Sequence, residues 1–308
     1  MRTLVVVVLI VFFVVVFFII KSEPYLEQKM YGYTDLLRKR HGTTAGGIPK
    51  IIIKTSWQTR GEFPPQMTDA LERTMMLNPD YKLYYFDDTE VHAFMKSYSK
   101  EALEAYRKLK PGAFKADLFR YCVLEKYGGC YSDIGHVMYA SFDEICGNNE
   151  IVVVRDMNNT GLHNALVCIT PSHPFMKMVV AKCIANIQKS YYGYDPLCIS
   201  GPILFGKAMS TYLAGEKDIL CSIPDLPIEN KVNSMMFRKY LGPGTKNKIR
   251  ILDFKRIDEE LEQNDDKFIV GQSGKIIVRS KFKNYYNVMY KNKEYYSDAW
   301  SSGNVYEK

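Results

Sequence analysis

The sequence lacks the short cysteine motifs that hold metal ions or carry out disulfide exchange. It contains seven cysteines, and no two of them are separated by two residues. A zinc ribbon or a thioredoxin-like redox site is therefore not expected. Four cysteines lie in apolar runs, which favours a role as core residues: Cys122, Cys130, Cys168 and Cys183. Because the total is odd, at least one thiol is free or pairs with another chain.

A nucleic-acid-binding motif is also absent, so nucleic acid is not expected as a partner. The chain has 41 Lys and Arg against 34 Asp and Glu, a net charge of +7, but its basic residues are scattered. A mildly basic protein of this kind suits an anionic small molecule or a membrane surface. A hydrophobic content of 47% is ample for a core, and 308 residues allow one large domain or two small ones.

One long hydrophobic run lies at the N-terminus. Residues 4–20 carry no polar side chain, and a helix of that length spans about 26 Å, enough for the hydrocarbon core of a bilayer. A cleavable signal peptide is the competing interpretation, but no small-residue cleavage site follows the run. We therefore predict a transmembrane signal anchor over residues 1–21. Residues 22–47 end in a flexible, glycine-containing composition and predict a stem or linker.

The most informative segment runs from Gly112 to Tyr139. Residues 113–127 contain no Pro or Gly and place apolar residues at roughly helical spacing, which predicts a helix. The glycine pair at 128 and 129 ends this helix, and a short strand follows and ends at Asp133. Ligands of open α/β sheets bind beyond the carboxyl ends of strands, so we expect Asp133 to lie at a binding site.

An acid and a guanidinium group precede that strand. Asp117 and Arg120 lie three residues apart and therefore share one face of the predicted helix. Arg120 offers a planar fork of donors next to a carboxylate. Taken alone, such a pair is more often a weak surface ion pair than part of a ligand site.

Alternating and continuous apolar runs predict the remaining elements. Asp87, before Thr89 and Glu90, is more typical of a helix N-cap than of a ribose ligand. The expected strands are residues 48–56, 82–86, 151–154, 165–169, 249–254 and 275–278, and the expected helices are residues 68–77, 90–97, 100–109, 175–188 and 203–213. The end of the chain, residues 295–303, reads as an aromatic and acidic loop, or as a tail without regular structure.

Two segments carry a family resemblance. The sequences K-A-D-L-F-R-Y at residues 115–121 and Y-G-G-C-Y-S-D-I-G at residues 127–135 resemble the donor-sugar region of family 32 glycosyltransferases, which contain a "DXD" motif. The same spacing occurs in the glucosylating bacterial toxins. The opening strand, I-P-K-I-I-I-K-T-S-W at residues 48–57, resembles the start of the same domain, with Ile53 and Lys54 at the family's usual His and Gln positions. The resemblance covers roughly residues 48–210.

The resemblance implies a fold and an activity. It implies a GT-A-like α/β domain over residues 48–308, with a mixed, mostly parallel sheet flanked by helices. Residues 48–210 would form the donor-binding core, and residues 211–308 the C-terminal part and a closing loop. The implied reaction is transfer of a hexose, with mannose favoured, from GDP-mannose or a UDP-sugar to a glycan or glycolipid, with retention of configuration. The implied location is that of a type II membrane protein of the Golgi or another endomembrane, with a lumenal catalytic domain.

The resemblance also assigns roles residue by residue. Asp117, Arg120 and Asp133 match the positions that bind the transferred sugar. Trp57 is either a core residue or a stacking partner of the nucleotide base. The remaining expected contacts, to acceptor or diphosphate, are Asn158, Gly201 and Trp300. Gly201 precedes a predicted helix N-terminus, which favours an anion, but a simple turn is the alternative. No residue is identified as a catalytic base.

One position departs from the family pattern. Gly135 stands where the second acid of the DXD motif belongs, and that acid is the usual metal ligand. A Mn²⁺ or Mg²⁺ ion would prefer oxygen ligands, so we expect Asp133 and Asp298 to hold it together with the donor phosphates. His136 is a second candidate for the missing ligand. Otherwise metal use is lost, and the protein is a catalytically impaired glycan or nucleotide-sugar binding protein.

Overall fold

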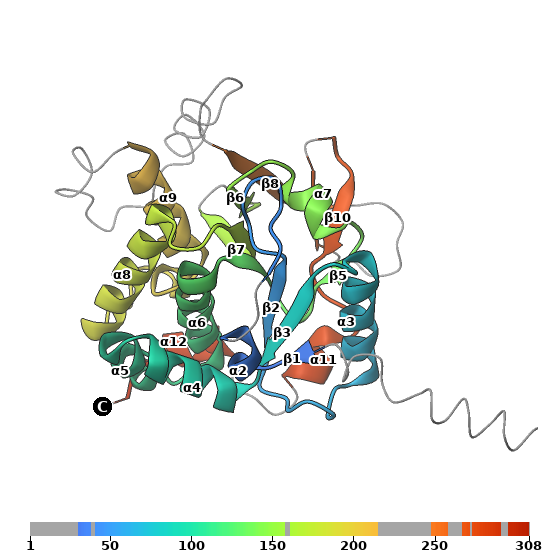
Figure 1. The fold of residues 1–308 in the computed structure, drawn as a ribbon. Helices are drawn as coiled ribbons and strands as arrows, with labels where there is room; N and C mark the ends of the chain where they lie inside the picture. The colour runs from blue at the N-terminus through green and yellow to red at the C-terminus, as the bar shows by residue number, and fades with distance from the viewer. Residues whose placement is uncertain are drawn as a thin grey trace, which may run out of the picture.

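The computed structural model describes residues 30–37, 41–157, 161–214, 248–257, 267–271, 273–290 and 295–307. Within them the chain forms one ten-stranded sheet with helices on both of its faces (Figure 1). The strands are β1 (Met30–Tyr31), β2 (Ile51–Thr55), β3 (Lys82–Phe86), β4 (Gly129–Ser132), β5 (Val137–Met138), β6 (Ile151–Arg155), β7 (Leu162–Ile169), β8 (Ile249–Arg256), β9 (Lys267–Val270) and β10 (Ile276–Arg279).

The sheet is mixed, with strand order β1-β3-β2-β4-β7-β6-β8-β9-β10-β5. The first four strands of this order pair in parallel, as do β6 and β8, and the other neighbours pair antiparallel. As a result seven strands point one way, and only β5, β7 and β9 point the other way. The carboxyl ends of β2, β3, β4, β6 and β10 therefore lie along the same edge of the sheet.

The helices form two layers. They are α2 (Tyr33–Leu36), α3 (Pro65–Leu77), α4 (Asp88–Tyr98), α5 (Lys100–Lys108), α6 (Gly112–Tyr127), α7 (Phe142–Cys146), α8 (Pro174–Gln188), α9 (Pro202–Ala214), α11 (Tyr285–Met289) and α12 (Tyr296–Ser301), with a 3₁₀ turn at Pro196–Cys198. Side chains of α2, α4, α5, α6, α8, α9 and α12 share one hydrophobic core, and side chains of α3, α7 and α11 share the other. Figure 1 shows the two layers on opposite sides of the strands.

Alternation along the central strands supplies both cores. Ile51 and Ile53 of β2 face the larger helical layer, whereas Ile52 faces the smaller one. In β4, Tyr131 faces the larger helical layer and Cys130 the smaller one. Successive side chains of a strand point to opposite faces, so a strand covered on both faces carries an unbroken apolar sequence. This explains why these strands read as continuous hydrophobic runs.

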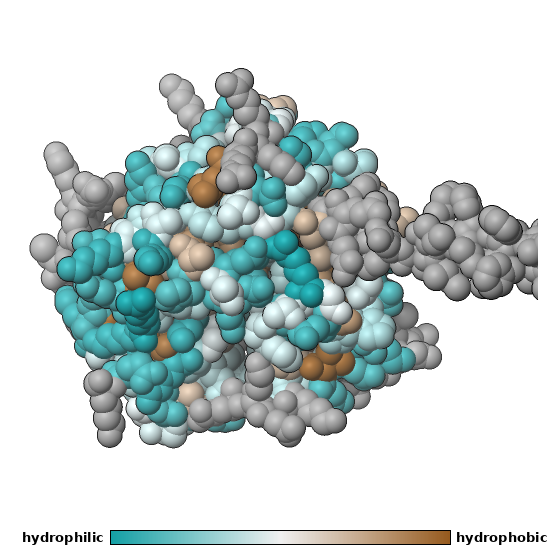
Figure 2. All heavy atoms as spheres, turned by 60° about the horizontal axis from the view of Figure 1, so that its bottom comes forward, coloured by the Kyte–Doolittle hydropathy of each residue, from teal (hydrophilic) through white to brown (hydrophobic). Residues whose placement is uncertain are grey.

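One face of the molecule can be judged for its polarity in a space-filling view. The face in Figure 2 is mostly hydrophilic, and its hydrophobic residues form small, separate patches. Among the described residues no helix combines the length and the apolar character needed to cross a bilayer. The predicted signal anchor at residues 1–21 lies outside the described residues.

The structure agrees with most expected elements and corrects others. The mixed α/β sheet is confirmed, the strand 82–86 is found as predicted, and Asp87 caps α4 by accepting a hydrogen bond from the Glu90 amide at 2.9 Å. Residues 295–303 were expected to be a loop, but most of them form α12, whose Ala299 is buried in the fold. Residues 30–37, assigned to the stem, form β1 and α2, so the domain begins before Ile48. Strand β9 was not predicted.

The double glycine after α6 is required by the backbone. Gly128 and Gly129 have φ angles of +64° and +93°, a conformation that L side chains rarely adopt. A Cβ on Gly129 would lie 2.3 Å from Cγ1 of Ile51 on the neighbouring strand β2. The pair therefore turns the chain from the helix directly into the sheet, and this turn fixes where β4 and Asp133 lie.

We expect Gly129→Ala to destabilise the fold by about 3 kcal/mol, because it adds both backbone strain and a clash with Ile51. Chemical denaturation followed by circular dichroism measures the change. Gly112→Ala is the matched control, since a Cβ at Gly112 meets no atom within 4 Å. It should change stability by less than about 1 kcal/mol. Equal stability of the two variants would contradict the conclusion that the backbone at position 129 requires glycine.

Candidate functional site

Three residues singled out from the sequence converge at the carboxyl end of β4. Arg120 reaches from α6 to both acids. Its Nη2 lies 3.3 Å from Oδ1 of Asp117, and its Nη1 lies 3.4 Å from Oδ1 of Asp133. One guanidinium group thus bridges a carboxylate on its own helix and a carboxylate on the strand exit. The convergence follows from the Gly128-Gly129 turn, which folds β4 back along the helix.

Asp117 is held by hydrogen bonds from two further elements. The Asn164 side chain on β7 donates to Oδ1 of Asp117 at 2.9 Å, and the Ser200 hydroxyl donates to Oδ2 at 2.9 Å. The Asn164 amide also donates to the Tyr121 hydroxyl at 2.7 Å, which in turn donates to the Ser200 carbonyl. Burial raises the pKa of Asp117 to about 6 despite Arg120 and these donors. The network fixes the carboxylate in one orientation.

Arg120 is equally constrained. It donates to the backbone carbonyl of Asn164 at 2.8 Å, and its guanidinium lies 4.5 Å from the centre of the Tyr131 ring. Burial lowers its pKa, but Tyr131, Asp133 and Asp117 outweigh that effect and hold the pKa above its usual value. Arg120 is therefore a permanent, buried positive charge.

A second cation reaches Asp133 from the segment after β10, a strand far from β4 in the sheet. Lys281 follows β10, and its ammonium lies 3.7 Å from Oδ2 of Asp133 and 4.2 Å from the centre of the Tyr285 ring. Burial raises the pKa of Asp133, but Arg120 and then Lys281 outweigh it and hold that pKa well below its usual range. Asp133 is therefore ionised at any physiological pH.

Accessibility increases across the cluster. The side chains of Arg120 and Asp117 are 7% and 11% exposed, whereas those of Asp133 and Lys281 are 23% and 30% exposed. A ligand would therefore meet Asp133 and Lys281 first. Tyrosines in and next to α11 and α12 pack against one another, starting from the Tyr285 ring under Lys281: Tyr285, Tyr286, Tyr290, Tyr295 and Tyr296.

A buried lysine donates hydrogen bonds to the backbone at the end of β4. The Lys54 side chain on β2 is 1% exposed, and its ammonium donates to the carbonyl of Asp133 at 3.0 Å. It also donates to the carbonyl and hydroxyl of Ser132 at 3.3 and 3.2 Å. Burial lowers the pKa of Lys54 to about 7, which the charge of Asp133 only partly counteracts. This residue stands at the position where the family has a glutamine.

The donor set around Asp133 does not fit a divalent cation. Within the described part of the chain, the one group of three metal-ligating side chains is Cys130, Cys146 and Cys168, which lies in the hydrophobic core. Asp133 instead has two cationic neighbours within 4 Å. At an effective dielectric constant of about 20, a divalent ion about 5 Å from one ammonium would be repelled by roughly 7 kcal/mol. A metal here would need ligands that these residues do not offer.

The side chains of the two residues proposed as further ligands make no hydrogen bond or ion pair with Asp133 in the described part of the chain. Asp298 is exposed on α12, and the only hydrogen bond of its carboxylate among the described residues comes from the adjacent Ser297 hydroxyl. The His136 ring is fully buried, its Nδ1 is 3.0 Å from the Ser132 hydroxyl, and burial lowers its pKa well below the usual value. Neither residue supplies Asp133 with a second anionic ligand.

The other expected contact residues come from different parts of the chain. Trp57 is 45% exposed just beyond the end of β2. Gly201 is buried directly after Ser200, at the start of α9. Trp300 is half-buried, and its indole N–H donates to the Tyr192 carbonyl at 3.0 Å, so its polar group is already engaged. Asn158 lies outside the described residues.

Sequence reasoning missed Asn164, Ser200, Lys54 and Lys281. Asn164 had a detectable signal, because it is a polar residue inside an otherwise apolar strand. Lys54 had a similar one, as a charged residue ending an isoleucine run. Lys281 had none, because only the pairing of β10 with β5 brings it near Asp133.

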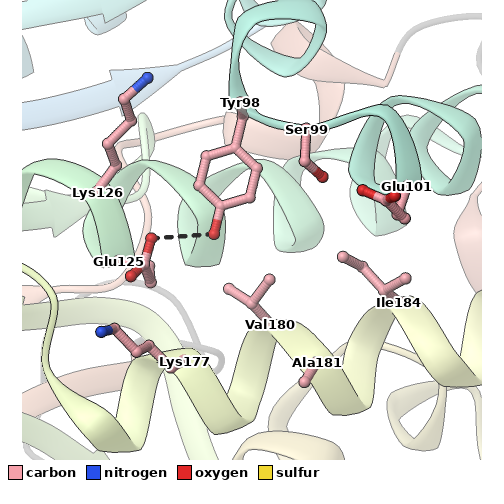
Figure 3. A pocket seen from close by; sticks show the side chains of 9 residues that line it. All are labelled: Tyr98, Ser99, Glu101, Glu125, Lys126, Lys177, Val180, Ala181 and Ile184. Carbon is pink, nitrogen blue, oxygen red and sulfur yellow. Dashed lines mark hydrogen bonds between the residues drawn. The ribbon is translucent and has the colours of Figure 1, made fainter.

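A separate cavity of about 570 Å³ opens on the larger helical layer. Figure 3 shows it between α4, α5, α6 and α8, where the Tyr98 hydroxyl donates to Glu125 at 3.0 Å. Val180, Ala181 and Ile184 form its floor, with Lys126 and Lys177 at one side. None of the residues around Asp133 lines it.

Comparisons with known proteins show similarity to one family model, to curated relatives and to a solved structure. Residues 64–152 match the family described as a glycosyltransferase sugar-binding region containing a DXD motif. This range includes Asp117, Arg120 and Asp133, and ends well before Lys281. Mannosyl phosphorylinositol ceramide synthase CSH1 of Saccharomyces cerevisiae is 28% identical over 145 residues, which are 47% of this chain and 37% of the relative.

Two other relatives are mannosyltransferases by name. Inositol phosphoceramide mannosyltransferase 3 of Schizosaccharomyces pombe is 27% identical over 52% of this chain and 45% of its own length. The initiation-specific alpha-1,6-mannosyltransferase of Candida albicans is 32% identical over 37% of this chain and 31% of its own length. The chain thus spans less than half the length of these relatives. Among solved structures, PaToxG glycosyltransferase covers 63% of this chain and 78% of its own, at 19% identity and a TM-score of 0.45.

Lys54 makes stability depend on pH. Its pKa falls from 10.5 in the unfolded chain to about 7 in the fold, so between these values the unfolded state binds the extra proton. The free energy of unfolding should therefore rise as pH increases, by about 2 kcal/mol from neutrality to about pH 9. Denaturant titrations at several pH values measure this slope.

Lys54→Met should remove the rise, while Lys283→Met, at an exposed lysine, should keep it. An unchanged slope in Lys54→Met would show that another group titrates.

Proposed function

We propose that this protein is a glycosyltransferase, because residues 64–152 match the family described as a glycosyltransferase sugar-binding region containing a DXD motif. It would move a hexose from a nucleotide sugar to a hydroxyl group of an acceptor. Two of the relatives named above are mannosyltransferases by name and the third is a mannosyl phosphorylinositol ceramide synthase, which favours mannose as the transferred sugar. The proposed donor is GDP-mannose, with a UDP-sugar as the alternative.

The observation that carries this proposal is the convergence of Asp117, Arg120 and Asp133. They come from two separate segments of the sequence, yet a single guanidinium group contacts both carboxylates. A surface ion pair would not be built this way, since Arg120 and Asp117 are almost fully buried and Asn164 and Ser200 orient the carboxylate. Such rigid, oriented polar groups are what a sugar-binding site needs, because hydroxyl groups are recognised by directed hydrogen bonds.

In the proposed reaction the bond between the anomeric carbon and the diphosphate oxygen breaks, and its electron pair stays on that oxygen. The acceptor hydroxyl oxygen forms the new bond to the anomeric carbon, and its proton passes to the departing phosphate. Asp133 and Asp117 would accept hydrogen bonds from the sugar hydroxyls. Arg120 would keep both carboxylates in place and ionised. We propose retention of configuration on the strength of the family resemblance.

The remaining assignments are part of the same proposal. Trp57, exposed just beyond the end of β2, would stack with the base of the donor. Gly201 lies next to Ser200, which binds Asp117, so it would line the donor or acceptor site. Trp300 and Asn158 complete the proposed acceptor or diphosphate contacts. The acceptor would be a glycan or a glycolipid.

The location follows from the same reasoning. We propose that residues 1–21 anchor the protein in an endomembrane of the Golgi type, with the domain in the lumen. An acceptor on a membrane lipid would then lie close to the active site.

A second candidate function is binding of a nucleotide sugar without turnover. Gly135 favours it, because the family's second DXD acid is missing there. The two functions differ in one measurable respect, since a binding protein would retain the donor intact.

The test is a panel of nucleotide sugars incubated with the full chain and a glycolipid acceptor, scored by release of free nucleotide and by product mass. We expect GDP-mannose to be turned over, and Asp133→Asn to lose about a hundredfold or more in kcat/KM, because it removes a charge that the substrate contacts. Asp143→Asn serves as the control, since Asp143 pairs with Lys50 away from the site. Full activity in Asp133→Asn would place the site elsewhere. Binding without turnover would favour the second function.

A further inference from the structure

We propose that the Lys281 ammonium takes the place of the divalent cation at this site and neutralises the donor diphosphate directly. The inference rests on the proposed function and deepens it, because it assigns a residue to the diphosphate and predicts that binding needs no metal. Lys281 lies outside the segment that matches the family.

Strand pairing delivers Lys281 to this position. β10 pairs antiparallel with β5, and Arg279 is opposite Val137. Continued by two residues, this register places Lys281 opposite Gly135. The side chains bear this out, since a Cβ on Gly135 would lie 3.1 Å from Cδ of Lys281. The lysine therefore stands beside the position at which the family carries its second acid.

The space for that acid is filled. A Cβ on Gly135 would lie 2.6 Å from Cε2 and 2.9 Å from Cδ2 of the Tyr285 ring. Contacts this short do not occur in real structures, so an aspartate at position 135 would have to displace Tyr285 and Lys281. The absence of the acid thus makes room for the Tyr285 ring, over which the Lys281 ammonium lies.

The charges around Asp133 balance, with two carboxylates and two cations, and the cation Lys281 is placed where a ligand would arrive. Asp117 and Arg120 compensate each other, and Lys281 faces Asp133 at 3.7 Å, too long for a hydrogen bond. Among the described residues nothing accepts a hydrogen bond from the Lys281 ammonium, so its three N–H donors remain for a ligand. Its 30% exposure makes it the most accessible charge in the cluster. The Tyr285 ring beneath the ammonium holds it in place through a cation–π contact.

These features suit a diphosphate. As the glycosidic bond breaks, the electron pair and the negative charge remain on the diphosphate oxygen. A fixed ammonium nearby stabilises that charge without a metal ion. Asp133 stays free to accept hydrogen bonds from the sugar, since it has no metal to coordinate.

Calorimetric titration of the full chain with GDP and UDP, in EDTA and then with added Mn²⁺, tests the inference. We expect one of the nucleotides to bind in EDTA, with a Kd that Mn²⁺ changes less than about threefold. Lys281→Gln should weaken binding by about tenfold or more, and Lys281→Arg should restore most of it, because the charge returns. Lys283→Gln, two residues along the same loop and exposed, should bind like the wild type.

Each other outcome is distinct. Binding that requires Mn²⁺, or normal binding by Lys281→Gln, overturns the inference while leaving the proposed function intact. Absence of binding by either nucleotide, with and without Mn²⁺, overturns the proposed function as well. Unfolding of Lys281→Gln is excluded by comparing its denaturation midpoint with that of Lys281→Arg.

Discussion

The site depends on one carboxylate held between two cations. Asp133 ends a central strand, with Arg120 at 3.4 Å on one oxygen and Lys281 at 3.7 Å on the other. These contacts join the helix before the strand to a strand from the last quarter of the chain. Without the two cations, burial would favour the protonated acid, and the site would lose its fixed charge. The network around Asp117 and the buried Lys54 both serve to hold this arrangement rigid.

The sheet topology explains why such distant segments meet. β4 lies in the middle of the sheet and β10 next to its far edge, yet both point the same way. The chain leaves β4 at Asp133, crosses by way of Gly135 and pairs with β10 as β5. The loop that carries the remnant of the DXD motif is therefore also the link between the two halves of the sheet. A substitution in this loop affects both the chemistry and the pairing.

The fold was largely readable from the sequence, because its strongest signals are local. Continuous apolar runs gave the buried strands, and the glycine pair gave the turn before Asp133. The segment at residues 295–303 was misread, because its helix α12 is short and owes its existence to packing against the larger core. The edge strand β1 was not predicted, because a strand of two residues carries no periodic pattern.

The sequence by itself determined the elements and the three charged residues at the heart of the site. Their spacing depends on helical periodicity and on a turn that only glycine permits, and both are properties of neighbouring residues. Tertiary structure alone decided which partners surround Asp133. Lys281 is nearly 150 residues away from it along the chain, and hydrogen bonding between β5 and β10 sets its register. What replaces the missing acid is therefore a matter of strand pairing and side-chain volume, neither of which a local pattern encodes.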